Sequence, residues 1–578
     1  MLKKIFVALV FSSAMFVWSG SSFAGGHCVG STMSDAYTGG KYPQQYELSE
    51  YESAASCTMK FSDNPSIASI NATIQGNPGS LPPVEDRLPD EPLVVVPYES
   101  IGKYGNTINF LSNATEAGTS DMLSTRHVNL VRFADDLSTV VPNVAKDYEW
   151  NDDFTTLTFM LRKGHKWSNG EPFVARDVEF WYEDLMMNPK IREKPYPYLL
   201  VGGEPMTVDV IDDQTVRFNL PSPFPGLLAT LATSYNQAFM PSHFLEQFHP
   251  EIDSNADANA QALGFADGWD ALAAYYGNSG WTDTPTPLLR NPELVDGLPY
   301  AAYPSLEAYM TIEDTTEGRV YAANPYFFQV DTAGNQLPYI DYQNERYINE
   351  NEIRLLKLVN GEVDYKSQSV QLESAPQLLD GAESGGYNIQ INPGCGAALF
   401  SFNVTHPDLE KRKVYGDIRF RQAMSIALDR NEINDVAYYG MGVVEQFTGM
   451  SPAPDFVRED MKMYMTQYDP DGAKALLDEV GLKDVDGDGF RELPNGEPFA
   501  MNIDYATQGI GGVEVELVAR MWNDVGVKTS FKEVTPDEYR GSQSSNALDV
   551  HAWDKGQPLA IIAGDPETFK APFGNYFN

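Results

Sequence analysis

The sequence predicts an α/β protein built from two or more lobes, and three observations lead to that fold class. Its length of 578 residues exceeds the size at which a single hydrophobic core stops growing, about 250–300 residues. Hydrophobic residues make up 42% of the chain and aromatic residues 12%, which is enough to build such cores. Strand-like and helix-like segments alternate along the chain, and this alternation favours partly parallel sheets.

The predicted strands are short runs of β-branched and apolar residues. Residues 93–96 (LVVV) are predicted to form a buried strand, and residues 155–161 (TTLTFML) a second. Residues 208–211 and 215–220 are separated by a short polar turn, which is typical of a hairpin. Residues 221–310 contain many Pro, Gly and Trp residues, and we expect long ordered loops there.

The clearest predicted helix lies in the C-terminal third. Asp469 is a suitable N-cap, Pro470 fits the first helical position, and Gly481 ends the helix. Between them, apolar residues recur at i, i+3, i+4 and i+7 starting from Ala473. Two further helices are predicted: residues 418–429, and an amphipathic segment that ends at Gly526 and leads into a strand.

The first 24 residues have the features of a secretory signal peptide. Lys3 and Lys4 form a basic head, residues 5–18 are mostly apolar, and Ser22-Phe23-Ala24 is a small-x-small cleavage pattern. The alternative is an anchor helix, but the apolar run is shorter than the ~20 residues that a bilayer requires. We therefore expect a soluble, periplasmic protein.

Residues 25–90 are rich in Ser, Gly, Pro, Asn and Thr, and we interpret them as a low-complexity, poorly ordered extension. The chain has three cysteines. Cys28 and Cys57 are candidates for a disulfide in an oxidising compartment, which would leave Cys395 free.

The balance of charge and the missing motifs exclude several classes of protein. The chain has 40 basic and 81 acidic residues, a net charge of −41, which disfavours nucleic acids and anionic membranes but permits cationic or neutral ligands. We attribute this charge mainly to solubility or salt adaptation. Nucleotide, serine-hydrolase and zinc-protease motifs are missing, and the seven histidines are scattered. The sequence therefore predicts a protein that is not an enzyme.

One acidic loop resembles the first half of a calcium-binding loop. Asp484, Asp486 and Asp488 occupy its first, third and fifth positions, and Glu492 its ninth. The twelfth position, which in a calcium loop holds a bidentate Glu, is Asn495. We favour an acidic turn, with a structural calcium held by the three aspartates as the alternative. No other cofactor is expected.

A second acidic segment, near the end of the chain, contains the candidate ligand-binding residues. Trp553, Asp554 and Asp565 combine an aromatic face with carboxylates, a combination that suits sugar rings or an ammonium group. The alternative is ordinary surface charge with one tryptophan anchoring a loop.

Several blocks together resemble a known family. They are residues 141–150 (VPNVAKDYEW), 161–178 (LRKGHKWSNGEPFVARDV), 324–327 (NPYF) with 334–341 (GNQLPYID), 361–364 (GEVD) and 419–430 (RFRQAMSIALDR). In order and spacing they resemble the family-5 extracellular solute-binding proteins, the peptide- and nickel-binding components of ABC importers. Within the blocks we expect Trp167 and Phe173 to be core residues, and Arg162 and Asp177 to pair with each other or with the backbone.

The resemblance implies a two-lobed periplasmic-binding-protein clamshell, class II-like, with an extra subdomain on the first lobe. The first lobe would span residues 91–380 and the second 381–578, with the ligand between them. The implied partners are a small-molecule ligand and the permease of an ABC importer, and the implied oligomeric state is a monomer. Because family members continue well past the position of Trp553, the second lobe is expected to be incomplete at its C-terminus.

The resemblance leaves the ligand open. Oligopeptides or peptide-like solutes are expected first, because peptide-binding members place an Asp in a second-lobe loop against the peptide's amino terminus, and Asp554 or Asp565 could match it. Oligosaccharides with β linkages are the alternative, because the blocks at 324–327 and 334–341 resemble a branch with oligosaccharide-binding members. A secreted hydrolase is a more distant alternative.

Overall fold

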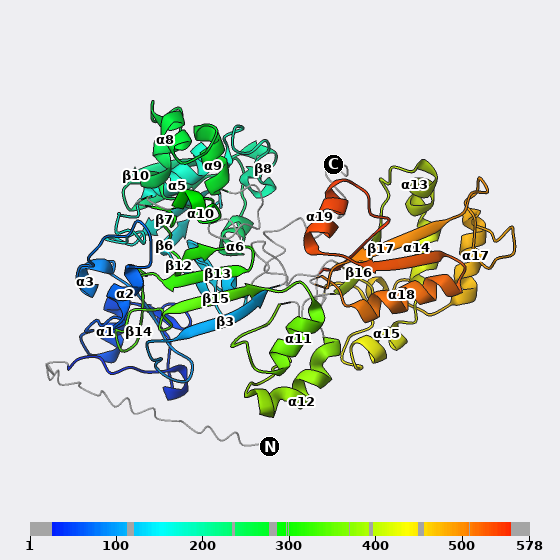
Figure 1. Ribbon diagram of the computed structural model, residues 1–578, viewed down its shortest axis with the longest axis horizontal. Helices are drawn as coiled ribbons and strands as arrows, with labels where there is room; N and C mark the ends of the chain where they lie inside the picture. Colours follow the sequence, from blue (N-terminus) through cyan, green and yellow to red (C-terminus); the bar gives the residue numbers. More distant parts are fainter. Residues whose placement is uncertain are drawn as a thin grey trace, which may run out of the picture.

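The computed structural model describes residues 26–112, 121–233, 237–276, 286–295, 298, 300–368, 370, 372–391, 397–448, 456–507 and 509–555. Figure 1 shows two bodies, with helices α11 (Asn351–Val359) and α12 (Ala375–Gly385) lying between them. Each body has its own hydrophobic core: one cluster runs from Ile70 to Phe328, the other from Phe402 to Ala552. The predicted two-lobed α/β fold is confirmed.

The first lobe is built on three main sheets. Their strand orders are β1-β2-β14, β12-β13-β15-β3 and β10-β11-β7-β6, and within them β2–β14 and β3–β15 are parallel pairs. The strands are β1 (Gln45–Glu47), β2 (Leu93–Val95), β3 (Thr107–Ser112), β4 (Val131–Phe133), β5 (Val140–Pro142), β6 (Ala145–Trp150), β7 (Thr156–Leu161), β8 (Leu200–Val201), β9 (Glu204–Pro205), β10 (Thr207–Asp212), β11 (Thr215–Asn219), β12 (Tyr309–Asp314), β13 (Gly318–Ala323), β14 (Gln329–Asp331) and β15 (Tyr342–Tyr347). The predicted strands at 93–96 and 155–161 correspond to β2 and β7, and the predicted hairpin is β10–β11.

Short helices surround these sheets. They are α1 (Leu48–Ala55), α2 (Ile67–Asn71), α3 (Val84–Arg87), α4 (Met122–Arg126), α5 (Ala175–Glu179), α6 (Gly226–Thr233), α7 (Ser242–Leu245), α8 (Ala256–Ala262), α9 (Gly268–Tyr276) and α10 (Pro292–Val295), with the single turns η1 (Met33–Asp35), η3 (Pro197–Leu199) and η4 (Glu246–Phe248) and the π-helix η2 (Phe180–Met186). The expectation of long loops over residues 221–310 was wrong, because α6 to α10 lie there. Their apolar residues, such as Leu227 and Leu272, pack into the first core, and this tertiary packing outweighs the local Pro and Gly signals.

The N-terminal segment corrects a second expectation. Residues 26–90 are not a poorly ordered extension: β1 pairs with β2 antiparallel, and a separate core joins Tyr46 and Tyr51 to Val94 and Val330. A disulfide connects Cys28 and Cys57, as the sequence suggested. The composition of this segment is polar, but Tyr46 and Tyr51 are buried in a core that includes residues of β2 and β14, outside the segment.

The residues of the 161–178 block have structural roles. Trp167 and Phe173 are both only 2% exposed, which confirms them as core residues. Arg162 and Asp177 do not pair with each other. Arg162 binds the backbone and Glu47, whereas Asp177 accepts hydrogen bonds from the Trp167 indole and from the backbone and hydroxyl of Ser242. Burial raises the pKa of Asp177 to about 6.

The second lobe contains the strands β16 (Ala397–Phe402), β17 (Ala500–Tyr505), β18 (Lys528–Glu533) and β19 (Val550–Lys555). Strands β17 and β18 are parallel, and β16 and β19 antiparallel. Asn502 of β17 donates its N–H to Asp549, just before β19, and Asp554 donates its N–H to Gly509, just after β17. Strand β19 therefore runs in the same direction as β17 and β18.

The helices of the second lobe cover this sheet (Figure 1). They are α13 (Leu409–Gly416), α14 (Ile418–Ile426), α15 (Arg430–Ala437), α16 (Glu459–Lys462), α17 (Pro470–Val480), α18 (Gly512–Asp524) and α19 (Pro536–Ser544). Helix α17 confirms the clearest sequence prediction. Asp469 caps it by accepting the Gly472 N–H at 2.8 Å, and Gly481 ends it with a φ of 96°, a left-handed conformation that glycine adopts without strain.

The chain passes from the first lobe to the second after β15. It forms α11, the turn η5 (Leu372–Ser374) and α12, and then enters β16. The lobe boundary expected at residue 380 therefore falls inside α12, between the last residue of the first core and the first residue of the second.

Candidate functional site

The candidate ligand-binding residues lie at the carboxyl edge of the second-lobe sheet. Strands β17, β18 and β19 end there, at Tyr505, Glu533 and Lys555, and α18 begins there at Gly512. In open α/β sheets, ligands bind outside the carboxyl ends of the strands, where loops and helix N-termini converge. The local sequence places polar residues in the loops that follow these strands.

Trp553 is half-buried and packs against its own lobe. Its ring centroid lies 5.1 Å from that of Tyr539 in α19, and 6.5 Å from that of His551. Gly509 lies directly against the indole, because a Cβ at that position would be only 2.2 Å from the ring. These contacts fix the orientation of the ring and leave part of it exposed.

Asp554 is exposed and interacts electrostatically with two residues that the sequence did not mark as site residues, Glu514 and Tyr438. Glu514 is 7% exposed, accepts the Gly511 N–H at 3.2 Å and bonds to the Tyr438 hydroxyl. Burial raises its pKa, and the charges of Glu373 and Asp554 raise it further. The pKa of Tyr438 is also raised, by burial, by Glu514 and by the charge of Asp554.

Glu373 approaches Glu514 and Asp554 from η5, which lies outside the second-lobe core. Its carboxylate accepts the N–H of Val513 in the first turn of α18, and its backbone oxygen accepts a hydrogen bond from the Tyr439 hydroxyl at 3.4 Å. Burial raises the pKa of Glu373. We call Glu373, Glu514, Asp554 and Tyr438 the junction cluster.

The junction cluster could be found only in part from the sequence. Glu514 lies at the third position of α18, where a Glu often bonds back to the helix N-cap, and this signal could have identified it. Nothing local marks Glu373. Chemically, the cluster offers three carboxylates and one aromatic ring, which bind ammonium groups and hydroxyl donors.

Three predicted residues or segments lie outside the described part of the chain. They are Asp565, Cys395 and the signal peptide at residues 1–24. Their predictions are unchanged.

The acidic loop brings its three aspartates together. One carboxylate oxygen each of Asp484, Asp486 and Asp488 lies within 4.8 Å of the others, and all three side chains are exposed. Asp484 accepts the N–H groups of Gly487 and Gly489, and Glu492 accepts that of Val485. The carboxylates thus already satisfy the backbone of the turn.

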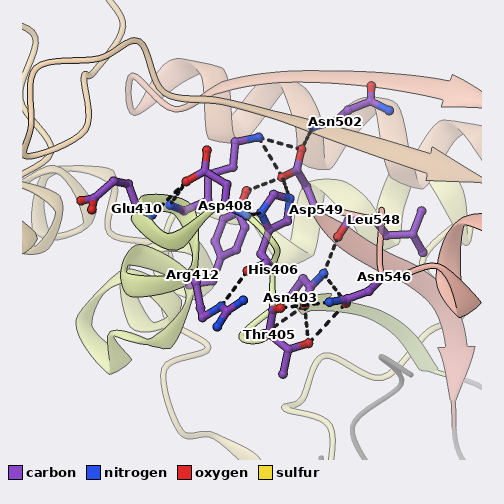
Figure 2. Close-up of polar contacts among 12 residues, drawn as sticks. Asn403, Thr405, His406, Asp408, Glu410, Arg412, Asn502, Asn546, Leu548 and Asp549 are labelled. Carbon is purple, nitrogen blue, oxygen red and sulfur yellow. Dashed lines mark hydrogen bonds and ion pairs between the residues drawn. The ribbon is translucent and has the colours of Figure 1, made fainter. Parts of the chain in front are cut away.

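A separate polar network lies at the opposite end of β19 (Figure 2). Asp549 is 11% exposed and accepts hydrogen bonds from Lys411, Tyr415 and the Asn502 N–H, and His406 Nε2 lies 3.2 Å from it. Burial alone would raise the pKa of Asp549, but the bonds from His406 and Lys411 outweigh it and lower the pKa to about 2. The network connects α13 to the sheet and therefore has a structural role. We call Asp549, His406, Lys411 and Tyr415 the Asp549 clasp.

The 334–341 block is also structural. Gln336 is buried and donates to the backbone oxygens of Pro325 and Phe327, while Arg87 donates to its side chain. Asp331 accepts hydrogen bonds from the Asn335 amide and the Tyr339 hydroxyl. The block therefore holds the N-terminal segment against β14 and does not itself favour a sugar ligand.

Two separate cores, an α/β topology in each lobe and a polar cluster at the junction define the class of two-lobed binding proteins. The model of the bacterial extracellular solute-binding proteins, family 5, matches residues 139–564. The chain belongs to this family.

One relative and two solved structures illustrate the range of ligands bound by proteins similar to this chain. The periplasmic alpha-galactoside-binding protein of Rhizobium meliloti (strain 1021) is 28% identical over 494 residues, 79% of this chain and 63% of that protein, so the chain spans less than two thirds of its length. A solved oligopeptide-binding protein, OppA, is 29% identical with a TM-score of 0.58, covering 92% of this chain and 81% of that one. The binding protein MelB of Agrobacterium fabrum C58, solved with stachyose, has a TM-score of 0.65 at 23% identity, covering 88% and 76%.

Proposed function

We propose that this chain is an extracytoplasmic receptor that captures an oligopeptide or peptide-like solute and delivers it to an ABC importer. The observation that carries the proposal is the junction cluster. Glu373, Glu514 and Asp554 interact electrostatically at the carboxyl edge of the sheet, and an ammonium group there would relieve their mutual repulsion. A peptide's amino terminus is such a group.

Several features support the same role outside the inner membrane. The pairing of Cys28 with Cys57 suits an oxidising compartment, and the first 24 residues have the pattern of a cleavable signal. No helix in the described part of the chain has the length and apolarity of a membrane span. Neither the junction cluster nor the Asp549 clasp contains a nucleophile paired with a base, and a binding function without catalysis is therefore proposed.

An oligosaccharide is the second candidate ligand. The alpha-galactoside-binding relative and the stachyose complex of MelB favour it, and the exposed part of Trp553 could stack on a sugar ring. Both α-galactosides and β-linked oligosaccharides belong in the test.

Thermal unfolding of the exported chain with each class of ligand decides between the candidates. Binding to the folded state alone stabilises it by RT ln(1 + [L]/Kd), about 2.7 kcal/mol at a hundredfold excess over Kd. We expect a rise in Tm with di- to pentapeptides that Asp554→Asn weakens and that Asp486→Asn, a matched loss of charge in the acidic loop, leaves unchanged. A rise with stachyose, cello- or xylo-oligosaccharides alone, lost in Trp553→Ala, would replace the peptide proposal with the sugar.

A further inference from the structure

Helix α11 is attached to the first lobe at both ends. Before it, Ile348 donates its N–H to Ser112 of β3. After it, Asp364 accepts hydrogen bonds from the N–H and the side-chain amide of Asn109, at 2.7 and 2.9 Å, and donates its own N–H to the Asn109 oxygen. Its two ends therefore follow the movement of β3.

A buried carboxylate extends this attachment along the chain. The side chain of Asp121 is 0% exposed. It forms an ion pair with Lys366 at 2.6 Å and accepts hydrogen bonds from the N–H groups of Ser367 and Gln368 and from the Ser367 hydroxyl. Residues 366–368 are thereby held to the N-terminus of α4 in the first lobe.

The same stretch of chain contacts the second lobe through η5 and attracts it through the charge of Arg354. Arg354 of α11 is 3% exposed and interacts electrostatically with Glu533, the last residue of β18. Glu373 of η5 accepts the Val513 N–H at the start of α18. This carboxylate also lies beside Gly511, since a Cβ at that position would be 3.6 Å from it, an ordinary contact distance. The backbone oxygen of Glu373 also accepts the Tyr439 hydroxyl.

We infer that Glu373 and Arg354 form an interlobe brace, a carboxylate placed against the N-terminus of α18 together with a charge attraction toward Glu533, by which a first-lobe segment fixes the angle of the second lobe in the absence of ligand. The hydrogen bonds of Asp121 and Asp364 hold one end of the segment, and Glu533 and the N-terminus of α18 receive the other. Carboxylates are favourable at helix N-termini, so the N-terminus of α18 is a specific binding position for the Glu373 carboxylate. In the unliganded protein, the brace restricts the second lobe to a narrower range of orientations relative to the first.

The test is a distance measurement between the lobes of the unliganded chain. Spin labels are attached at Glu204→Cys in the first lobe and Asp471→Cys in α17, both exposed positions, with Cys395→Ser and the Cys28–Cys57 disulfide intact. We expect Glu373→Ala combined with Glu533→Gln to broaden the distance distribution and to shift its populations about five-fold, because the two changes remove the carboxylate at α18 and the charge that attracts Arg354.

Glu538→Gln is the matched control, because Glu538 is an exposed carboxylate that pairs with Lys532 in the same lobe. It should leave the distribution unchanged. An unchanged distribution in the double variant, or equal broadening in Glu538→Gln, would overturn the brace. A melting curve shows that each variant is folded. Since no ligand is used, the result is independent of the proposed ligand class.

Discussion

Glu47 and Arg162 lie 115 residues apart in the sequence and form a bidentate ion pair, with oxygen–nitrogen distances of 2.6 and 2.9 Å. The guanidinium side chain is 0% exposed, and its other hydrogen bonds go to the backbone oxygens of Asn143, Glu91 and Ala145. The pair fastens the N-terminal segment to the first-lobe sheet that contains β7.

Removing one partner of this pair should be costly. Glu47→Gln leaves a buried cation without its counter-charge, and we expect a loss of about 3 kcal/mol in the free energy of unfolding. Chemical denaturation measures it. Lys163→Ala, next to Arg162, removes the exposed pair with Asp90 and should cost no more than about 1 kcal/mol. Equal effects of the two changes would contradict this account.

His165 should make the protein sensitive to mild acid. The ring is buried between Phe173 and Phe328, and neither ring nitrogen has a partner among the described residues. Burial lowers its pKa to about 3. As the pH falls from about 6.5 to 3, His165 binds a proton in the unfolded chain but stays neutral in the folded chain. The free energy of unfolding therefore decreases by up to about 1.4 kcal/mol per pH unit.

The variant His165→Leu should remove this pH dependence. We also expect this variant to have a free energy of unfolding at pH 7 that is about 1–2 kcal/mol higher than that of the native chain, because two unpaired polar groups leave the core. Denaturation at pH 7 and pH 4.5 measures both effects. His27→Gln, a change at an exposed histidine, is the control and should behave as the native chain.

The Asp549 clasp should also lose stability in acid, but over a lower pH range than His165. Since the folded-state pKa is about 2, below the ordinary value, the clasp contributes stability above about pH 4 and loses it as the pH falls toward 2. Asp549→Asn should cost about 2 kcal/mol at pH 7, and the difference from the native chain should disappear near pH 2. Glu410→Gln, in the more exposed pair with Lys413, should show little effect at either pH.

The disulfide should stabilise the N-terminal segment by restricting the unfolded chain. Cys28 and Cys57 are 29 residues apart, and a loop of that length corresponds to about 3–4 kcal/mol in the chain-entropy model. We expect Cys28→Ser with Cys57→Ser to lower the unfolding free energy by up to that amount. Thiol titration of the unfolded native chain should find one free cysteine, and three would contradict the pairing.

The acidic loop should act as a turn without calcium. We expect ~1 mM Ca²⁺ to leave Tm unchanged, because Asn495 replaces the bidentate ligand of a calcium loop. Asp484→Ala should lower Tm, because Asp484 accepts two backbone N–H groups of the loop. A calcium-dependent rise in Tm that Asp486→Asn abolishes would establish a metal site in place of the turn.

The sequence by itself determined the features that are encoded locally. Helix α17 could be predicted from Asp469 to Gly481 because its cap, its apolar spacing and its glycine all lie within one short segment. The β10–β11 hairpin follows from the same kind of local pattern. Trp167 and Phe173 were expected to be buried because large aromatic residues usually pack in cores, and the family blocks implied two lobes.

Only the tertiary structure decided the rest. Residues 26–90 are ordered because Arg162 and β2 supply partners from elsewhere in the chain. The junction cluster exists because η5 brings Glu373 to the start of α18, about 140 residues further along the sequence. The function of a polar residue depends on which groups contact it in the folded structure. Local sequence encodes conformation through short-range sterics and hydrogen bonds, but it does not encode which distant groups will meet.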